Sequence, residues 1–404
     1  MSIQQREQAL STATKSMRSQ VSKTEIIPFY LLIGSYFVYQ LQGVLFTSGG
    51  ALSQSLLLVV IAIDLYYFGR ILLLKHKNSF YYLWTSFFAL NLLGFLFWGG
   101  SLSNPFHFTM LKGIVICLAS FYPAYYLSRK GVLQRKELLI FFALQLVGSV
   151  ALYFNYATSM TKILLETKGA DLVNNVAYDF AFLIPFLLLI KKREFLTYLL
   201  LALMISFVVA GAKRGAIVVG GVMTIIFYYH QVRSSSSSSM KTTLLALIAI
   251  VSLGIAINYI VQSDEFLTNR FSDLLEGNSS GRGRIYSAIW NGWKGSSNEW
   301  IPFLFGFGFA GSQSLTGGLF AHNDWLEMLS NFGLVGITLY LSLIICGFWY
   351  AFSKHKLAQS DERLLMLMIM AGWFLSSLFS MWYTSMGCMT QSMLLGYLMG
   401  KSKR

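Results

Sequence analysis

The side chains best suited to chemistry in this sequence are a histidine and its polar neighbours in the stretch AHNDWLE, residues 321–327. Asn323 and Asp324 are residue types that begin helices, and Glu327 falls in the first turn, where the helix dipole favours an acid. Helix initiation does not explain His322, because a neutral imidazole gives a helix little that a serine would not. An imidazole titrates near neutral pH, so His322 is a candidate general base.

Two adjacent cations stand in the short segment AGAKRGA at 210–216. An arginine presents a planar, permanently charged group that matches phosphate oxygens, so Lys213 and Arg214 are candidates for holding an anion. Gly211 and Gly215 allow the backbone to come close to such a group. Two simpler explanations stay open. In the first, the pair anchors the chain to lipid head groups. In the second, one membrane span more or fewer than expected precedes it, which places the two cations on the cytoplasmic side, where Lys and Arg are common.

A second basic pair lies in NSSGRGRIYSAIW, where Arg282 and Arg284 are predicted to begin a helix. Exposed N–H groups at a helix start add to side-chain charge in favour of an anion. The glycines of FGFGFAGS, which follows at 305–312, lack the strand and the Lys-Ser/Thr ending that a phosphate-binding loop requires. We therefore expect these glycines to let the backbone approach a helix or lipid closely.

These segments interrupt a chain that has the composition of a polytopic membrane protein. Of its 404 residues, 55% are hydrophobic and only 12% are charged, which excludes an ordinary soluble globule. Repeated apolar runs near the bilayer-crossing length of about 20 residues predict about twelve transmembrane helices. We expect them near residues 26–46, 51–69, 80–98, 108–128, 138–157, 172–190, 195–211, 215–229, 242–262, 329–351, 364–382 and 386–400.

The basic residues predict how these helices are oriented. With a cytoplasmic N-terminus, most of the 31 Lys and Arg residues fall in the N-terminal tail, in alternate connections and in the terminal KSKR. Loops rich in Lys and Arg stay on the cytoplasmic side, so the other connections are predicted to be external. The formal charge of +14 is then a sign of topology and of attraction to anionic lipids. It does not indicate nucleic-acid binding.

The chain is thereby divided into four regions. Residues 1–25 form a cytoplasmic tail, 26–262 hold nine helices, 263–328 form one large external loop with most of the motifs, and 329–404 hold three more helices and a short basic tail. Ionisable groups inside a membrane are functional candidates by default, and Asp179 lies near the outer end of its helix. Asp64 lies near a cytoplasmic helix end, where Arg70 is its expected partner.

Taken in order along the chain, AKRGA, SGRGRIY, GFGFAG and AHNDWLEMLSNFGLVG resemble the O-antigen ligase and Wzy-type polysaccharide polymerase superfamily. The resemblance covers the arrangement of spans and is specific over residues 278–340. It implies a GT-C-like membrane glycosyltransferase fold in the bacterial cytoplasmic (inner) membrane, with one large periplasmic loop and an active site facing the periplasm. It also implies that a glycan moves from an undecaprenyl diphosphate carrier to an acceptor hydroxyl, with inversion and without metal or other cofactor.

The same resemblance implies roles for individual residues. His322 would be the general base that takes the proton from the acceptor hydroxyl, and Arg214 and Arg282 would hold the departing diphosphate. Arg284 is the alternative to Arg282, although the aromatic residue expected four positions after the arginine is Tyr286, which favours Arg282. The remaining substrate-binding or positioning candidates are Lys213, Asn323, Asp324, Glu327 and Asp179.

Three functions stay open. A polymerase, the leading one, would join carrier-linked repeat units, with membrane lipids around it and a chain-length regulator protein as a potential partner. A ligase would move the finished glycan onto lipid A core or a protein. A flippase or transporter would need charges deep in several spans and broken helices at the midplane, whereas the unusual charges here gather at one outer face. No carboxylate cluster suited to a divalent metal is apparent in the external segments.

Overall fold

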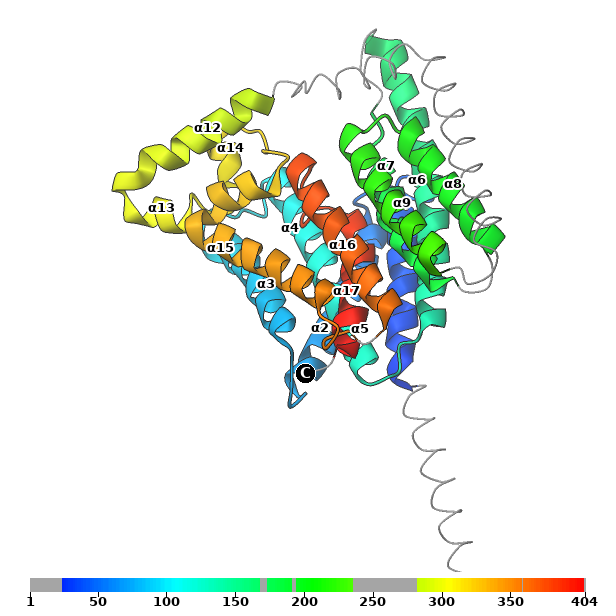
Figure 1. Cartoon of the computed structure of the whole chain (residues 1–404). Coiled ribbons are helices and arrows are strands. Elements are labelled where there is room, and N and C mark those ends of the chain that lie inside the picture. The colour runs from blue at the N-terminus through cyan, green and yellow to red at the C-terminus, as the bar shows by residue number, and fades with distance from the viewer. Residues whose placement is uncertain (1–23, 168–172, 191–193, 235–281, 358, 403–404) are drawn as a thin grey trace, which may run out of the picture.

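The computed structural model describes residues 24–167, 173–190, 194–234, 282–357 and 359–402. These residues form packed helices, and they contain no strand beyond one isolated bridge (Figure 1). Six helical segments among them are long and apolar enough to cross a membrane, and two shorter apolar helices accompany these. The chain is therefore an all-α protein with the helices of a membrane protein. The expected span at 242–262 lies outside the described residues, as does the expected loop up to residue 281.

The helices follow one another along the whole chain. Residues 24–40 form the first helix. It is followed by α2 (Ala51–Leu72), α3 (Ser79–Phe97), α4 (Pro105–Ala119), α5 (Phe121–Arg129), α6 (Arg135–Thr167), α7 (Ala177–Leu183), η1 (Ile184–Leu189), α8 (Glu194–Ala210) and α9 (Arg214–Ser234). After the gap come α12 (Arg282–Gly295), η2 (Ser296–Asn298), α13 (Trp300–Phe305), α14 (Gly311–Thr316), α15 (Asp324–Phe352), α16 (Ser360–Phe379), η3 (Met386–Cys388) and α17 (Met389–Lys401).

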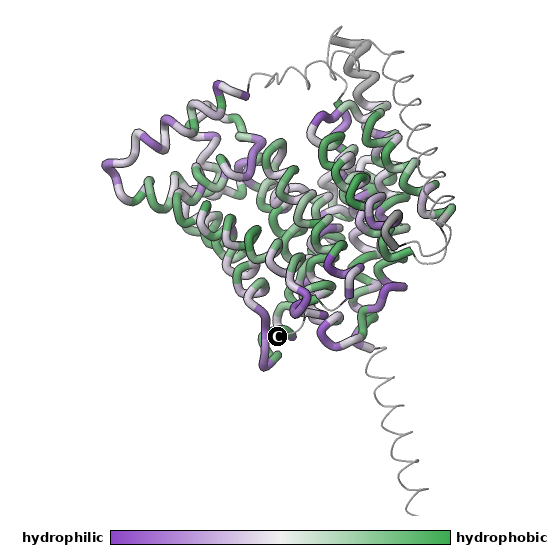
Figure 2. Tube along the Cα trace, viewed as in Figure 1, coloured by the Kyte–Doolittle hydropathy of each residue, from purple (hydrophilic) through white to green (hydrophobic). Residues whose placement is uncertain are grey.

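The helices of the bundle are apolar on all sides, which is typical of helices that face lipid as well as protein. Leu58 and Leu65 on α2 are 66% and 55% exposed, and Ile345 on α15 is 58% exposed. Figure 2 shows hydrophobic residues along the helices and hydrophilic residues concentrated toward their ends. An outer surface of this kind is stable in hydrocarbon and unfavourable in water.

Helices α17 and α5 pack closely against each other at the centre of the bundle. Gly396 and Gly400 allow this approach, because a Cβ at Gly396 would collide with the carbonyl oxygen of Phe121, and one at Gly400 would lie 2.6 Å from that of Tyr125. Small residues spaced four apart are a common means of close helix packing in membranes. Two stacked tryptophans also lie in the bundle, Trp373 on α16 and Trp382 in the segment after it. Their ring centroids lie 4.1 Å apart.

The helix that follows the histidine motif, α15, is interrupted at Gly333, whose φ of 58° and ψ of −146° are not helical. The carbonyls of Ser330 and Asn331 accept hydrogen bonds from the N–H groups of Phe307 and Gly308, at 2.7 and 3.0 Å. Backbone polar groups at membrane depth need partners within the protein, and the FGFGFAGS segment supplies hydrogen-bond partners where α15 is broken. The close backbone approach that the FGFGFAGS glycines predict is confirmed.

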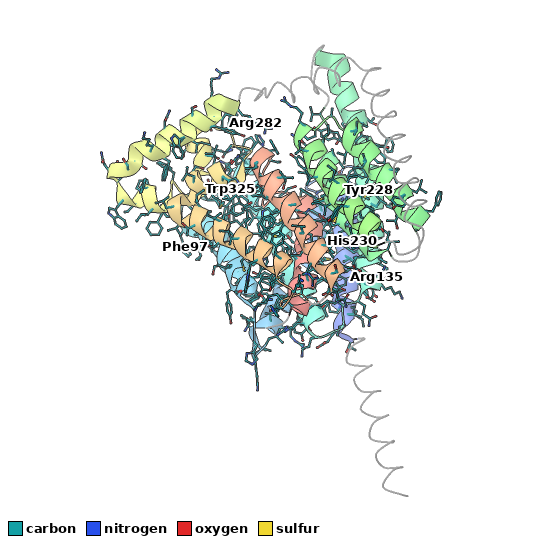
Figure 3. All side chains as sticks on the ribbon, in the orientation of Figure 1. Phe97, Arg135, Tyr228, His230, Arg282 and Trp325 are labelled. Atoms are coloured by element: carbon teal, nitrogen blue, oxygen red, sulfur yellow. The ribbon has the colours of Figure 1, made fainter. Side chains whose placement is uncertain are left out.

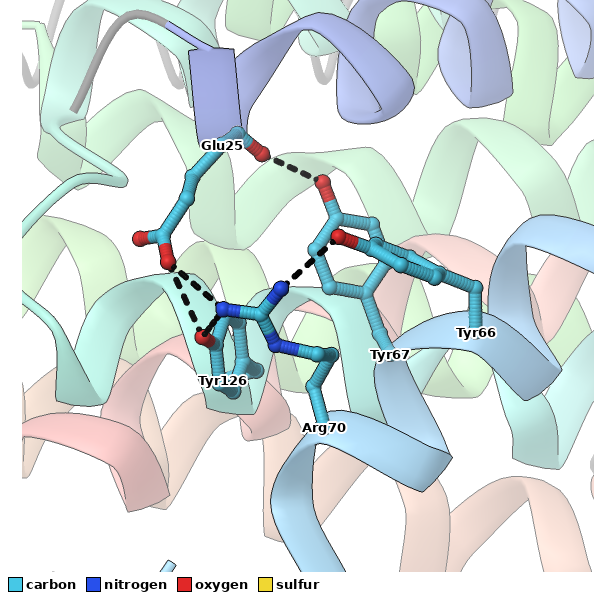
Figure 4. A network of polar contacts seen from close by, with 5 residues as sticks. All are labelled: Glu25, Tyr66, Tyr67, Arg70 and Tyr126. Atoms are coloured by element: carbon cyan, nitrogen blue, oxygen red, sulfur yellow. Dashed lines mark hydrogen bonds and ion pairs between the residues drawn. The ribbon is translucent and has the colours of Figure 1, made fainter. Parts of the chain in front are cut away.

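At the opposite end of the bundle, Arg70 does not pair with Asp64 as expected. Its guanidinium donates to Glu25 Oε1 at 2.9 Å and to the Tyr126 hydroxyl at 2.8 Å (Figure 4). The expectation is wrong because side chains six residues apart on a helix leave from different faces. The carboxyl of Asp64 is buried, and its two oxygens have no hydrogen-bond partner among the described residues.

We expect Gly396→Leu to lower the thermal midpoint of unfolding of the purified protein in detergent, because the larger side chain pushes α17 away from α5. Overpacking of this kind costs about 1–3 kcal/mol. Gly69→Leu is the matched control, since a Cβ at Gly69 meets no atom within 4 Å. An unchanged midpoint for Gly396→Leu would contradict the packing of α17 on α5.

Candidate functional site

A pocket of about 620 Å³ lies at the end of the bundle where α4 and α9 begin. Its walls come from the first turns of α4, from α7, from the turn between α8 and α9, and from the segment that joins α16 to α17. Lys213 and His322, which are far apart in the sequence, both line it. Among the other lining residues, the polar ones include Asn175, Ser380 and Thr384, and the aromatic ones Phe106, Phe182, Phe320 and Trp382.

The backbone at His322 has an unusual conformation. Its φ is 52°, in the left-handed region that residues with a Cβ rarely adopt. Among the described residues, the other non-glycine positions of this kind are Ala212, which precedes Lys213, and Ala310. Such conformations persist only where surrounding contacts enforce them, and they cluster at functional sites. Two of the three therefore stand at or beside residues that line the pocket.

Asn323 fixes the chain immediately after His322. Its side-chain oxygen accepts a hydrogen bond from Leu326 N at 3.1 Å and so caps α15, as the sequence predicts. Its amide nitrogen donates to the carbonyl of Leu378 near the end of α16, at 3.0 Å. The helix consequently begins at Asp324 and not at residue 329, which shortens the expected loop.

Asp324 is fully buried and joins three parts of the chain. Its Oδ2 accepts from the Tyr340 hydroxyl at 2.6 Å, and its Oδ1 accepts from the backbone N–H of Trp382 at 2.9 Å. Tyr340 in turn accepts from Trp373 Nε1 at 2.7 Å. Helix initiation is thus an incomplete explanation of Asp324, because its carboxyl is turned into the core. There it binds the Tyr340 hydroxyl from farther along α15 and the backbone N–H of Trp382 from the α16–α17 connection.

Glu327 is also fully buried and fixes the chain immediately before His322. One carboxyl oxygen accepts from the backbone N–H of Ala321, and the other accepts from the Ser312 hydroxyl of α14 at 2.8 Å. The backbone on both sides of His322 is therefore tied to separate elements. We call the three residues that do this, Asn323, Asp324 and Glu327, the His322 clamp.

The His322 imidazole remains accessible to solvent but is partly enclosed by protein. This partial loss of solvation lowers the pKa of His322 below its ordinary value of 6.5, and the positive charges of Arg282 and Lys213 lower it further. At neutral pH the imidazole is consequently neutral and able to accept a proton. Lys213 lines the same pocket, and the guanidinium of Arg282 binds the carbonyl of Phe379, the residue before Ser380 in the pocket wall.

The turn AGAKRGA is held against the segment that leads into α7. The N–H of Asn174 donates to the carbonyl of Gly211 at 2.9 Å. This arrangement brings Lys213 to the pocket, whereas Arg214 is the first residue of α9 and is not among the lining residues. The predicted tight turn is confirmed, and it is Lys213 rather than Arg214 that faces the pocket.

Arg282 is the first described residue of α12, at the base of the arm that α12 and α13 form beside the bundle (Figure 1). Figure 3 labels Arg282 at this place. Its guanidinium donates to the carbonyl of Phe379 at the end of α16, at 2.9 Å. Arg284 is exposed, and neither it nor Tyr286 lines the pocket. Of the two candidate arginines, Arg282 is therefore the one beside the site.

Asp179 lies on α7 next to the pocket but does not line it. Its carboxylate packs on Gly387 of η3, where an added Cβ would collide with it. The preceding residue, Tyr178, lines the pocket instead, as do hydroxyl residues of the α16–α17 connection such as Ser385. Sequence reasoning missed these residues. The hydroxyl-rich SMWYTS at 380–385, between two apolar runs, is a signal that could have indicated Ser385 but not Tyr178.

The pocket combines a neutral base, nearby positive charge, hydroxyl groups and aromatic faces. Within the described ranges, no three His, Cys, Asp or Glu side chains gather closely enough to hold a metal ion. The arrangement suits removal of a proton from a hydroxyl beside an anionic group.

The chain was compared with known families and proteins. No protein-family model matches it, and no curated protein matches it either.

Proposed function

We propose that this chain is a membrane glycosyltransferase that polymerises a surface polysaccharide, as an O-antigen polymerase of the Wzy type does. The proposal includes a GT-C-like fold with about twelve spans. The observation that carries it is the pocket shared by His322 and Lys213, with Arg282 beside it, at one end of a bundle of apolar helices. In this proposal that end faces the periplasm, and donor and acceptor are both linked to undecaprenyl diphosphate.

His322 acts as the base in the proposed reaction. The acceptor hydroxyl gives its proton to the imidazole while its oxygen attacks the anomeric carbon of the donor. The bond from that carbon to the diphosphate oxygen breaks, and its electron pair leaves with the diphosphate. Attack opposite to the leaving group inverts the anomeric carbon, and His322 later gives its proton to solvent.

Lys213 and Arg282 stabilise the negative charge that grows on the diphosphate as the bond breaks. Both cations are held in place before the reaction, Arg282 by the Phe379 carbonyl and Lys213 by the turn bound to Asn174. Charges that need no rearrangement during the reaction lower the barrier most effectively. Arg214, at the first residue of α9, is proposed as a further contact of the diphosphate.

Deleting the gene in its own bacterium tests this function. Lipid capped with a single repeat unit would identify a polymerase, and carrier-linked polymer with bare acceptor core would identify a ligase.

Restoring the gene as His322→Ala should leave glycan extension reduced about 10²- to 10⁴-fold, the contribution of a general base. Polymer of normal length from a stably inserted His322→Ala protein would contradict the assignment.

Two arginines on one helix provide a matched pair for the anion contact. Arg282→Gln should reduce glycan extension by about 10²- to 10³-fold, because it removes a positive charge that stabilises the departing diphosphate. Arg284→Gln changes the same residue type two positions away, on the exposed face of α12, and should leave extension near normal. The reverse pattern would mean that Arg284 contacts the diphosphate.

The pH dependence of extension should report His322. The neutral imidazole is the active form, so activity is present above the His322 pKa and is lost as the pH falls through it, below about 6.5. Lys213→Gln removes one cause of the lowered pKa and should move this acid limb to higher pH. A normalised pH profile measured on membranes checks this, and an unmoved limb would show that another group is the base.

Cysteine labelling tests the orientation. Leu102 and Leu73 are 69% and 80% exposed at opposite ends of the bundle, and Leu102 lies at the pocket end. In a background in which Cys346, which is not buried, is replaced by serine, a cysteine at 102 should react with an impermeant maleimide in intact cells. A cysteine at 73 should react only after lysis. The opposite result would place the pocket in the cytoplasm.

A further inference from the structure

The hydroxyl of Tyr178 is a buried polar group of the pocket that the proposed reaction has not used. Tyr178 lines the pocket from α7 and is only 6% exposed. Its oxygen is buried, and no described residue completes a hydrogen bond of good geometry with it, although Ser380 lies nearby. Leaving a buried hydroxyl without a partner is unfavourable, so its position calls for an explanation.

This hydroxyl faces the beginning of α9. An added Cβ at Gly215, the second residue of α9, would collide with the Tyr178 oxygen, so the two are in direct contact. The first hydrogen bond of the helix runs from Ile217 N to the carbonyl of Lys213, at 3.0 Å. The N–H groups of Gly215 and Ala216 precede it and have no acceptor within the helix.

The electrostatic surroundings of this helix end are positive. The first turn of α9 carries no acidic residue, and the aligned peptide dipoles of this helix add positive potential there. Lys213 lines the pocket and the charge of Arg282 acts on the Tyr178 hydroxyl. None of the described residues that line the pocket carries a carboxyl group. An anion is therefore the ligand that this corner favours.

We propose that the Tyr178 hydroxyl and the N-terminus of α9 form an anion site, in which the phenol O–H and the Gly215 and Ala216 N–H groups donate to phosphate oxygens. Lys213 and Arg282 supply its charge. The ligand is a diphosphate, either free or at the end of a polyprenyl chain. This inference rests on the proposed function and deepens it, because it assigns the diphosphate of the donor to one corner of the pocket.

Gly215 has a specific role in this site. A side chain there would displace the Tyr178 ring, so the glycine permits the hydroxyl to reach the helix start. Gly215→Ala should consequently weaken diphosphate binding by the same mechanism as loss of the hydroxyl. It provides a second variant that does not alter the phenol itself.

Tyr178→Phe tests the site because it removes only the oxygen. Binding of inorganic diphosphate and of undecaprenyl diphosphate to the full-length protein in nanodiscs would be measured by thermal stabilisation. We expect Tyr178→Phe to weaken both by about tenfold, the effect of one hydrogen bond to a charged group. Tyr81→Phe is the matched control, since its hydroxyl is also buried without a partner but lies outside the pocket, and it should bind as wild type does.

The outcomes separate the two ligand sources and the two proposals. Much tighter binding of the lipid-linked form would identify the carrier as the ligand, and equal binding would identify free diphosphate; both support the site. Wild-type affinity in Tyr178→Phe, or no binding by the wild type, would overturn it. If Tyr178→Phe weakens binding while deletion of the gene leaves the surface polysaccharide unchanged, the anion site stands and the proposed function fails. If His322→Ala is inactive and Tyr178→Phe binds normally, only the anion site fails.

Discussion

The geometry of the pocket depends on the hydrogen bonds of two buried carboxyl groups, those of Asp324 and Glu327. A carboxyl group enclosed by protein is stable only when hydrogen-bond donors reach it, and removing a donor from such a network is expensive. Tyr340, the N–H of Trp382, the Ser312 hydroxyl and the N–H of Ala321 must therefore remain in place. Because these donors belong to separate segments, the His322 clamp joins α14, α15 and the α16–α17 connection around one histidine.

The same requirement accounts for the irregular backbone near the site. Helices that cross a membrane satisfy their own backbone groups, and a break is tolerated only where other parts of the protein supply partners. The interruption of α15 at Gly333 is satisfied by the N–H groups of residues 307 and 308, and the turn at 211–213 is bound to Asn174. Both irregular segments are thus held by partners from distant parts of the chain.

The distribution of charge around the pocket follows from where the acids point. Asp324 and Glu327 face the core and Asp179 packs on Gly387, so none of these three carboxyl groups lines the pocket. The cations remain on the pocket side, with Lys213 in its wall and Arg282 beside it. A neutral imidazole next to positively charged side chains is a suitable arrangement for deprotonating an acceptor while an anionic group leaves.

Local signals in the sequence were sufficient for part of this structure. The apolar runs predicted an all-α membrane protein, Asn323 predicted a helix cap, and the AGAKRGA turn was correctly placed before a helix. Each of these features depends on residues within a turn or two. Six described spans support the membrane class, while the expected number of about twelve stays a prediction.

Only the tertiary structure decided which distant residues meet. It brought Lys213 to His322, placed Tyr178 rather than Asp179 in the pocket, paired Arg70 with Glu25, and turned Asp324 and Glu327 inward. The physical reason lies in the helices themselves. An amphipathic helix shows in its sequence which face it buries, but these helices are apolar all round, so their rotation and neighbours are set by packing contacts such as that of Gly396 on α5.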